Sequence, residues 1–261
     1  MTEWRTFTST AMGGPVRYRI IRGSGDAPLP VAYLLHGRGD SANSWEPVLE
    51  DLRRLPLIAV LPDAPWTSRA SYYVDSAHRS GQAVETAFAV DLVADVDAHL
   101  GRSGDRRYRI VAGYSMGGFG ALRLALAHSS VFSAAISLSP AVYVPEPPVG
   151  SSARESGAFG RGTDTFAADR YRELNYPALL TGLPADRAVR LAVAVGDAEP
   201  PHPGAPAALA MTEQARRLVA AADRAPGVQA TLRSYRGGHD FAVWRPALFD
   251  ALTDLVGEPH S

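Results

Sequence analysis

The sequence predicts an α/β fold with a mostly parallel central sheet and helices on both faces, in a single domain over residues 1–261. Two observations predict it. Short and nearly continuous apolar runs alternate along the chain with longer segments of helical periodicity. Such runs are typical of strands buried on both faces of a parallel sheet, and their alternation with helices is typical of βαβ units. Functional residues are then expected in the loops that follow the strands.

The predicted strands begin with residues 16–22, where apolar and polar side chains alternate as in a half-exposed strand. Residues 31–35 and 57–61 are apolar runs, and each leads into a turn-forming sequence, HGRGD and PDAPW respectively. From the same apolar pattern, the remaining strands are predicted at residues 108–112, 134–139, 191–195 and 231–235.

The first predicted helix covers residues 83–100, where an apolar side chain recurs at every fourth position from Val84 to Leu100. Further helices are predicted at residues 116–128, 206–222 and 244–256. Residues 144–165 differ from the rest because they are rich in proline, glycine and serine and have no period. We expect a lid-like insertion there, over about residues 144–175, at the edge of the sheet.

The composition excludes several classes of function. A net charge of −1 does not provide the broad basic field of a nucleic-acid-binding protein. Because cysteine and lysine are both absent, disulfides, thiolate nucleophiles, cysteine metal sites, Schiff bases and the P-loop lysine are excluded. No constellation of metal ligands is visible in the sequence, and no cofactor is expected.

The N-terminal sequence MTEWRTFTSTAMGG lacks the apolar run of a signal peptide. No stretch of the chain approaches the roughly 20 apolar residues that cross a bilayer. We therefore expect a cytoplasmic protein with no membrane partner. A monomer and a homodimer are both compatible with the sequence.

A serine turn follows the strand predicted at residues 108–112. The sequence GYSMG at residues 113–117 fits the G-x-S-x-G pattern of a nucleophile elbow, in which a strand reverses into a helix with serine at the apex. The glycines two residues either side of Ser115 allow the strand and the helix to approach closely. A glycine-rich turn without a catalytic role is the alternative, but the flanking apolar strand and helix favour Ser115 as a nucleophile.

The turn after the second apolar strand is expected to help bind a carbonyl oxygen. Its backbone can present an N–H group, and we expect the N–H of Arg38, with Gly37 and Gly39 as alternatives. The N–H of Met116, the residue after the nucleophile, is expected to complete this oxyanion hole. We expect His36 to brace the turn rather than to act in catalysis.

A histidine is required as the general base for Ser115. Of the seven histidines, His239 is favoured because it directly follows the last predicted strand, in the sequence RGGHDF. The two glycines before it allow the imidazole to reach across the strand edge. His202 and His78 are the alternatives, and each can equally be a solvated loop histidine.

The third member of the site is expected to be a carboxylate on the loop after residues 191–195. That loop reads GDAEP, and both Asp197 and Glu199 qualify. Asp197 directly follows a glycine, where aspartate commonly closes a turn onto its own backbone. Glu199 lies farther out and has the longer side chain, so it is favoured, with Asp197 as the alternate acid.

With these residues in place, the chain resembles the putative-esterase family of α/β-hydrolases. That family includes esterase D (S-formylglutathione hydrolase), the antigen 85 mycolyltransferases, feruloyl esterases and enterochelin esterases. The matching stretches are YLLHGRGD (33–40), LPDAPW (61–66), SYYVDS (71–76), GYSMGGFGALRLAL (113–126), SLSPAVY (137–143) and GGHDFAVWRPAL (237–248). The resemblance implies the α/β-hydrolase fold, acyl-ester chemistry and an acid about three residues after a strand-end glycine, which again selects Glu199.

These residues predict a serine hydrolase of carboxylesterase or thioesterase type that acts on a small-molecule acyl ester or thioester. An acyltransferase that passes the acyl group to a sugar or alcohol is the nearest alternative, and a non-catalytic ligand-binding protein is the second. Trp66, Tyr72 and Trp244 lie near the motif loops and are expected to line the substrate pocket, although each can equally be a core or rim residue.

Overall fold

The computed structural model describes residues 2–25, 28–63, 69–101, 104–184 and 186–257. Its centre is an eight-stranded sheet in the order β1-β2-β4-β3-β6-β7-β9-β10. β1 and β2 are antiparallel, β2 is antiparallel to β4, and every pairing from β4 to β10 is parallel. The predicted mostly parallel sheet is therefore confirmed.

The strands of this sheet are β1 (Thr2–Ser9), β2 (Gly14–Arg22), β3 (Val31–Leu35), β4 (Ile58–Pro62), β6 (Arg109–Tyr114), β7 (Ala134–Leu138), β9 (Val189–Gly196) and β10 (Val228–Tyr235). Two short strands, β5 (Ala77–His78) and β8 (Arg161–Gly162), pair with each other outside it. All of the predicted strands are present, and their bounds differ from the predicted ones by a few residues.

The helices are α1 (Leu49–Leu52), α2 (Val84–Thr86), α3 (Val93–Leu100), α4 (Met116–Ala127), α5 (Ser152–Glu155), α6 (Ala168–Leu174), α7 (Tyr176–Gly182), α8 (Met211–Ala222) and α9 (Phe241–Gly257). The π-helical segment Ala87–Leu92 joins α2 to α3, so the helix predicted at 83–100 is continuous. Short 3₁₀ turns lie at Ala42–Val48, Arg106–Tyr108 and Ala207–Leu209.

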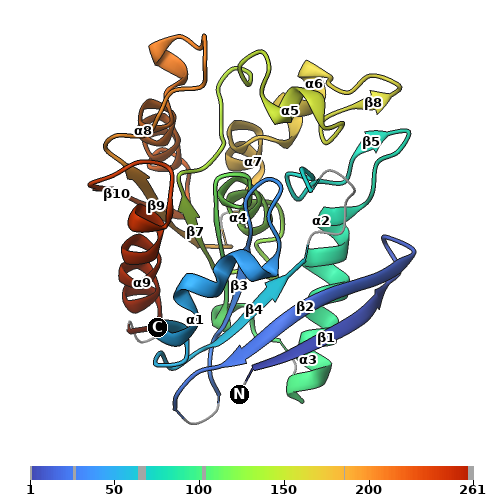
Figure 1. Ribbon diagram of the computed structural model, residues 1–261, viewed down its shortest axis with the longest axis vertical. Coiled ribbons are helices and arrows are strands. Elements are labelled where there is room, and N and C mark those ends of the chain that lie inside the picture. Colours follow the sequence, from blue (N-terminus) through green and yellow to red (C-terminus); the bar gives the residue numbers. More distant parts are fainter. Residues whose placement is uncertain (1, 26–27, 64–68, 102–103, 185, 258–261) are drawn as a thin grey trace.

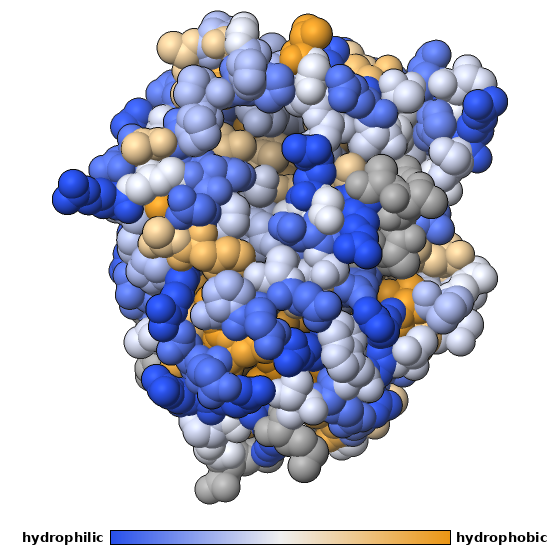
Figure 2. Space-filling model, viewed as in Figure 1, coloured by the Kyte–Doolittle hydropathy of each residue, from blue (hydrophilic) through white to orange (hydrophobic). Residues whose placement is uncertain are grey.

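The core lies on both faces of the sheet. In β3, Val31, Tyr33 and Leu35 pack into one apolar cluster, together with side chains of α3, α4, α7 and α8. Ala32 and Leu34 pack into the other cluster, together with side chains of α1 and α9. Because successive strand residues point to opposite faces, a strand that is apolar throughout must be covered on both. Figure 1 shows these layers, and Figure 2 shows one outer surface, which is mostly hydrophilic with small apolar areas between.

Two segments differ from the sequence prediction. β1 was not predicted, although Thr2–Ser9 is rich in β-branched and aromatic residues, a signal typical of a strand. A lid-like insertion was expected over about residues 144–175, with irregular backbone at 144–165 where the sequence has no period; α5 and β8 lie within 144–165, and α6 follows them. Phe159 and Tyr171 of this insertion are fully buried, with ring centroids 4.8 Å apart. Tertiary packing therefore orders a segment that has no periodicity of its own.

A buried charged cluster ties the helix after the serine turn to the rest of the molecule. Glu85 accepts hydrogen bonds from Arg123 Nε at 2.7 Å and lies 2.9 Å from His128 Nε2. Arg123 also donates to the carbonyl of Leu174 at the end of α6. Burial alone would raise the pKa of Glu85, but the hydrogen bond with His128 and the charge of Arg123 outweigh it and lower that pKa. α4 is thereby anchored to α2 and α6.

Candidate functional site

Ser115 lies at the sharp turn between β6 and α4. Its backbone has φ of 56° and ψ of −117°, a left-handed conformation that is unfavourable for a residue with a Cβ. Three backbone hydrogen bonds hold it there: Ser115 N donates to Leu138, and Ser115 O accepts from Phe119 and Ala141 at 3.1 and 3.0 Å. Strain of this kind persists only where the surroundings over-determine it, and it is found at functional sites.

The glycines around Ser115 are required by close backbone contacts. A Cβ on Gly113 would lie 2.3 Å from the carbonyl oxygen of Gly117, and one on Gly117 would lie 2.2 Å from the carbonyl oxygen of Leu35. No real Cβ approaches backbone so closely, so the helix and the strands meet only because both residues are glycine. The expected close approach at the elbow is confirmed.

We expect Gly117→Ala to lower the free energy of unfolding by about 1–3 kcal/mol, because the new methyl group must displace backbone on β3. Urea denaturation measures the loss. Gly14→Ala is the matched control, since a Cβ at Gly14 has nothing within 4 Å and should change stability by only about 0.5 kcal/mol. Equal losses in the two variants would contradict the steric explanation.

The turn after β3 lies beside the serine. Arg38 and Met116 line the same cavity as Ser115, and neither backbone N–H has a hydrogen-bond partner among the described residues. Met116 is the first residue of α4, where the N–H groups point out of the helix end. Gly39 has a φ of +79°, as expected for a tight turn at this point. The side chain of Tyr114 fastens this turn by donating to Asp40 Oδ2 at 2.7 Å.

His36 is buried behind the turn rather than in the cavity. Its Nδ1 lies 2.8 Å from the carbonyl oxygen of Gly37, and its own carbonyl accepts from the hydroxyl of Tyr73. Burial lowers the pKa of His36, so the neutral form is favoured. This geometry agrees with a bracing role.

His239 and Glu199 form a close pair at the carboxyl ends of β10 and β9. His239 Nδ1 lies 2.7 Å from Glu199 Oε2, and the glutamate side chain is 1 % exposed. Glu199 Oε1 also accepts from the backbone N–H of Gly196 at 3.0 Å and from the hydroxyl of Ser139. His239 lines the same cavity as Ser115. A buried carboxylate with these donors is held in one orientation towards the imidazole.

Asp197, the alternate acid, points elsewhere. Its side chain is exposed, and Oδ1 accepts from the backbone N–H of Gly237 at 2.9 Å. It therefore braces the loop that carries His239, while Glu199 contacts the imidazole itself. The sequence predicted that the Asp197 side chain closes a turn onto its own backbone. Instead, it accepts a hydrogen bond from the backbone of Gly237, on the neighbouring loop.

Trp244 lies behind His239 instead of in the cavity wall where we expected it. The two rings are perpendicular with centroids 5.0 Å apart, and Trp244 stacks on Tyr114 at 4.3 Å. Its Nε1 donates to Ser139 Oγ at 2.9 Å, and Ser139 in turn donates to Glu199. Trp244 and Ser139 thus support the carboxylate and the imidazole from behind. Sequence reasoning missed Ser139, although its position at the end of a predicted strand was a usable signal.

The cavity at Ser115 has a volume of about 240 Å³. Besides Ser115 and His239, it is lined by Arg38, Tyr72, Met116, Ala141, Tyr143, Gly150, Ser151, Ser152, Glu155, His202 and Met211. Tyr72 is therefore where it was expected, whereas Trp66 lies outside the described residues. His202 is at the cavity but its Nδ1 lies 3.2 Å from the carbonyl of Pro203, and His78 lies 2.8 Å from Ser80.

Residues 9–255 match the family model described as putative esterase. The chain belongs to the putative esterase family. The match covers most of the chain, including all of the strands from β2 to β10 and the loops that carry Ser115, Glu199 and His239. Its members act on esters, and this chain is an ester hydrolase of that family.

Solved structures have the same fold as this esterase. A ferulic acid esterase has a TM-score of 0.72 and 21 % identity, over 98 % of this chain and 97 % of its own. The fluorophosphonate-binding serine hydrolase F of Staphylococcus aureus has a TM-score of 0.72 and 18 % identity, over 99 % of both chains. The S-formylglutathione hydrolase of Staphylococcus aureus has a TM-score of 0.69 and 17 % identity, over 98 % of both. No curated protein sequence matches the chain.

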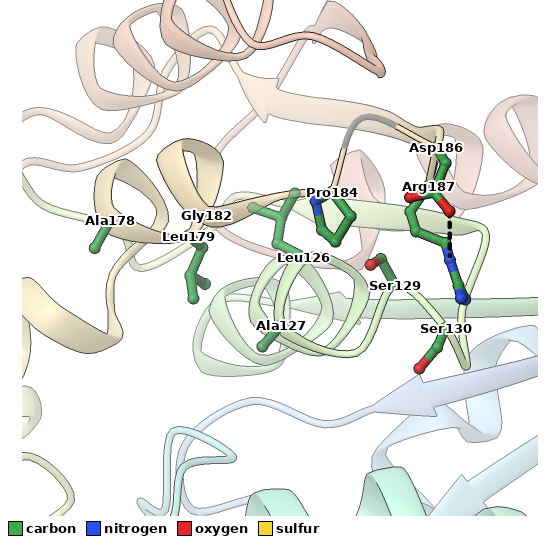
Figure 3. A pocket seen from close by; sticks show the side chains of 10 residues that line it. All are labelled: Leu126, Ala127, Ser129, Ser130, Ala178, Leu179, Gly182, Pro184, Asp186 and Arg187. Carbon is green, nitrogen blue, oxygen red and sulfur yellow. Dashed lines mark ion pairs between the residues drawn. The ribbon is translucent and has the colours of Figure 1, made fainter.

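A larger hollow of about 520 Å³ lies elsewhere on the esterase, between the end of α4 and α7. Figure 3 shows that leucine, alanine and serine side chains line it, and that its charged residues Asp186 and Arg187 approach each other. It does not include Ser115, Glu199 or His239. Despite its smaller size, the cavity at Ser115 is the one that brings reactive groups together.

Metal-ligand clusters and membrane-spanning helices are both absent from the described part of the chain. It contains no cluster of three or more His, Cys, Asp or Glu side chains arranged to hold a metal ion. None of its helices combines the length and the apolar character needed to span a bilayer.

Proposed function

We propose that this esterase is a serine hydrolase in which Ser115 is the nucleophile, His239 the general base and Glu199 the acid that orients the histidine. The observation that carries the proposal is the 2.7 Å contact between His239 Nδ1 and buried Glu199, with His239 and Ser115 on one cavity. A carboxylate, an imidazole and a serine in this arrangement are the groups that acyl transfer requires.

The proton moves through His239. Because Nδ1 is bound to Glu199, Nε2 is the nitrogen that serves Ser115. As Ser115 Oγ bonds to the carbonyl carbon of the ester, its proton passes to Nε2, and the buried carboxylate stabilises the imidazolium that forms. The imidazolium then protonates the leaving alcohol or thiol as the ester bond breaks. Water repeats the sequence on the acyl-enzyme and releases the acid.

The negative charge on the carbonyl oxygen is received by the backbone N–H groups of Arg38 and Met116. Both N–H groups lack a partner among the described residues, and both residues line the cavity. The N-terminal end of α4 adds a favourable dipole at Met116. Donors that are already oriented need no rearrangement as charge develops, which is why such sites contribute strongly to rate.

A fluorophosphonate probe tests the assignment directly. Intact-mass analysis should show one adduct, and peptide mapping should place it on Ser115. His239→Ala should abolish the adduct, because an unactivated serine hydroxyl does not attack the phosphorus. Ser130→Ala, at an exposed position in the other hollow, is the control and should be labelled like the parent protein. Absence of labelling on the folded protein, or an adduct on another serine, would contradict the proposal.

A further inference from the structure

β7 lies in the sheet between β6, which leads to Ser115, and β9, which leads to Glu199 (Figure 1). The turn at the carboxyl end of β7 contacts both residues. Leu138 accepts from the backbone N–H of Ser115 at 2.8 Å, and the N–H of Ala141 donates to the carbonyl of Ser115 at 3.0 Å. Between these contacts, Ser139 donates through its hydroxyl to Glu199 Oε1. This turn therefore bridges the nucleophile and the acid.

The backbone of Ser139 is held in an unfavourable conformation. Its φ of 43° lies in the left-handed region, which is costly for a residue with a Cβ. The residue is fully buried, and its backbone N–H donates to the carbonyl of Ala194 on β9 at 2.7 Å. Strain of this kind persists only where the surroundings impose it, and it is concentrated at functional sites. Here it occurs at the residue whose hydroxyl contacts Glu199.

The hydroxyl of Ser139 is oriented by its two partners. The indole Nε1 of Trp244 lies 2.9 Å from Ser139 Oγ, and an indole N–H can only donate. The hydroxyl therefore accepts from Trp244 and directs its own proton to Glu199. A serine hydroxyl with fewer partners is free to rotate, whereas this one is a donor of fixed direction.

The two oxygens of Glu199 have separate partners. Oε1 accepts from Ser139 and from the backbone N–H of Gly196 at 3.0 Å, and Oε2 lies 2.7 Å from His239 Nδ1. The side chain is 1 % exposed, so water does not readily replace a lost donor. Without the Ser139 hydroxyl, one donor remains on Oε1, and the carboxyl group can rotate about its last bond. The oxygen that faces His239 is then no longer held.

We propose that Ser139 is a positioning residue of this hydrolase, whose hydroxyl keeps the Glu199 carboxylate in the rotation that pairs it with His239. The inference rests on the proposed roles of Ser115, Glu199 and His239. Ser139 is not among the residues that line the cavity, so it acts on the reaction through Glu199 and does not touch the substrate. Its loss should therefore lower kcat and leave KM close to the parent value.

Two substitutions remove the hydroxyl in different ways. Ser139→Ala keeps the Cβ and the backbone strain, whereas Ser139→Gly relieves the strain because glycine readily adopts a positive φ. The two variants therefore differ in stability but share the loss of the donor. We expect both to lower kcat for 4-nitrophenyl butyrate about tenfold to hundredfold, the effect of one hydrogen bond to a charged group.

Ser137→Ala is the matched control. Ser137 lies two residues earlier on β7 and is 1 % exposed, and its hydroxyl donates to the carbonyl of Gly118 at 2.7 Å. The substitution removes a buried hydroxyl from the same strand, but one that does not contact Glu199. We expect its kcat to stay within about threefold of the parent, and melting temperatures compare the stability cost of the variants. A loss of kcat as large as that at Ser139 would overturn the specific role of Ser139.

A double substitution separates positioning from packing. In Glu199→Gln the side chain at position 199 has no charge to present to His239, so its rotation no longer affects the imidazolium. Adding Ser139→Ala to this variant should lower kcat by less than about twofold further, whereas a general packing defect costs the same factor in both backgrounds.

Equal losses in the two backgrounds, or an unchanged kcat in both Ser139→Ala and Ser139→Gly, would overturn the positioning role. The proposed function would stand in either case if the fluorophosphonate adduct forms on Ser115 and Glu199→Gln loses activity. No adduct on Ser115, together with full activity of Glu199→Gln, would overturn both.

Discussion

Ser115→Ala should lower kcat for ester hydrolysis by about 10⁶-fold, the loss typical of removing the nucleophile of such a triad. The remaining oxyanion donors and binding contacts still leave a rate above that in water. Kinetics on 4-nitrophenyl butyrate measure the change. The substitution removes one oxygen at a position already held by three backbone hydrogen bonds, so stability should be retained.

Ser130→Ala controls for the loss of a serine hydroxyl on the surface, and it should retain the parent kcat. Circular dichroism should show that both variants are folded. Turnover by Ser115→Ala within tenfold of the parent would contradict the assignment of the nucleophile and would direct attention to another group on the cavity, such as Ser151 or Ser152.

Glu199→Gln should lower kcat by about 10⁴-fold, because a neutral amide neither stabilises the imidazolium nor holds His239 in the required tautomer. The glutamine keeps the size of the side chain and an oxygen that accepts from Gly196 and Ser139. The loss therefore reports charge and orientation rather than packing. Kinetics on the same ester measure it.

Asp197→Asn is the matched control for this prediction. Asp197 lies two residues from Glu199 on the same loop and bonds Gly237 through an oxygen that asparagine also has. We expect its kcat to remain within about tenfold of the parent, since its carboxylate does not contact His239. A larger loss in Asp197→Asn than in Glu199→Gln would reverse the assignment of the acid.

Buried side chains behind His239 and Glu199 hold these two residues in place. Trp244 packs against His239 and donates to Ser139, which donates to Glu199. Trp244 also stacks on Tyr114, the residue before the nucleophile, and Tyr114 fastens the turn that contains Arg38. One aromatic side chain thus connects the loops of the acid, the base and the nucleophile, and their relative positions depend on core packing.

The helices and the strand in the segment 144–175 could not be predicted from the local sequence pattern. The proline, glycine and serine content of residues 144–165 indicated irregular backbone, but α5 and β8 are present there, and α6 follows them. These elements form because Phe159 and Tyr171 enter the core beside Phe119. The burial of these rings depends on residues that are distant in sequence, so local periodicity does not predict it.

The sequence by itself determined the fold class, the serine turn and the loop that carries His239. These features depend on local patterns: apolar periodicity sets strands and helices, and glycine spacing permits the elbow. Only the tertiary structure decided that Glu199 contacts His239 while Asp197 binds Gly237, and that Trp244 lies behind the imidazole. Side chains on separate strands meet according to strand order, register and packing, and these are properties of the assembled sheet.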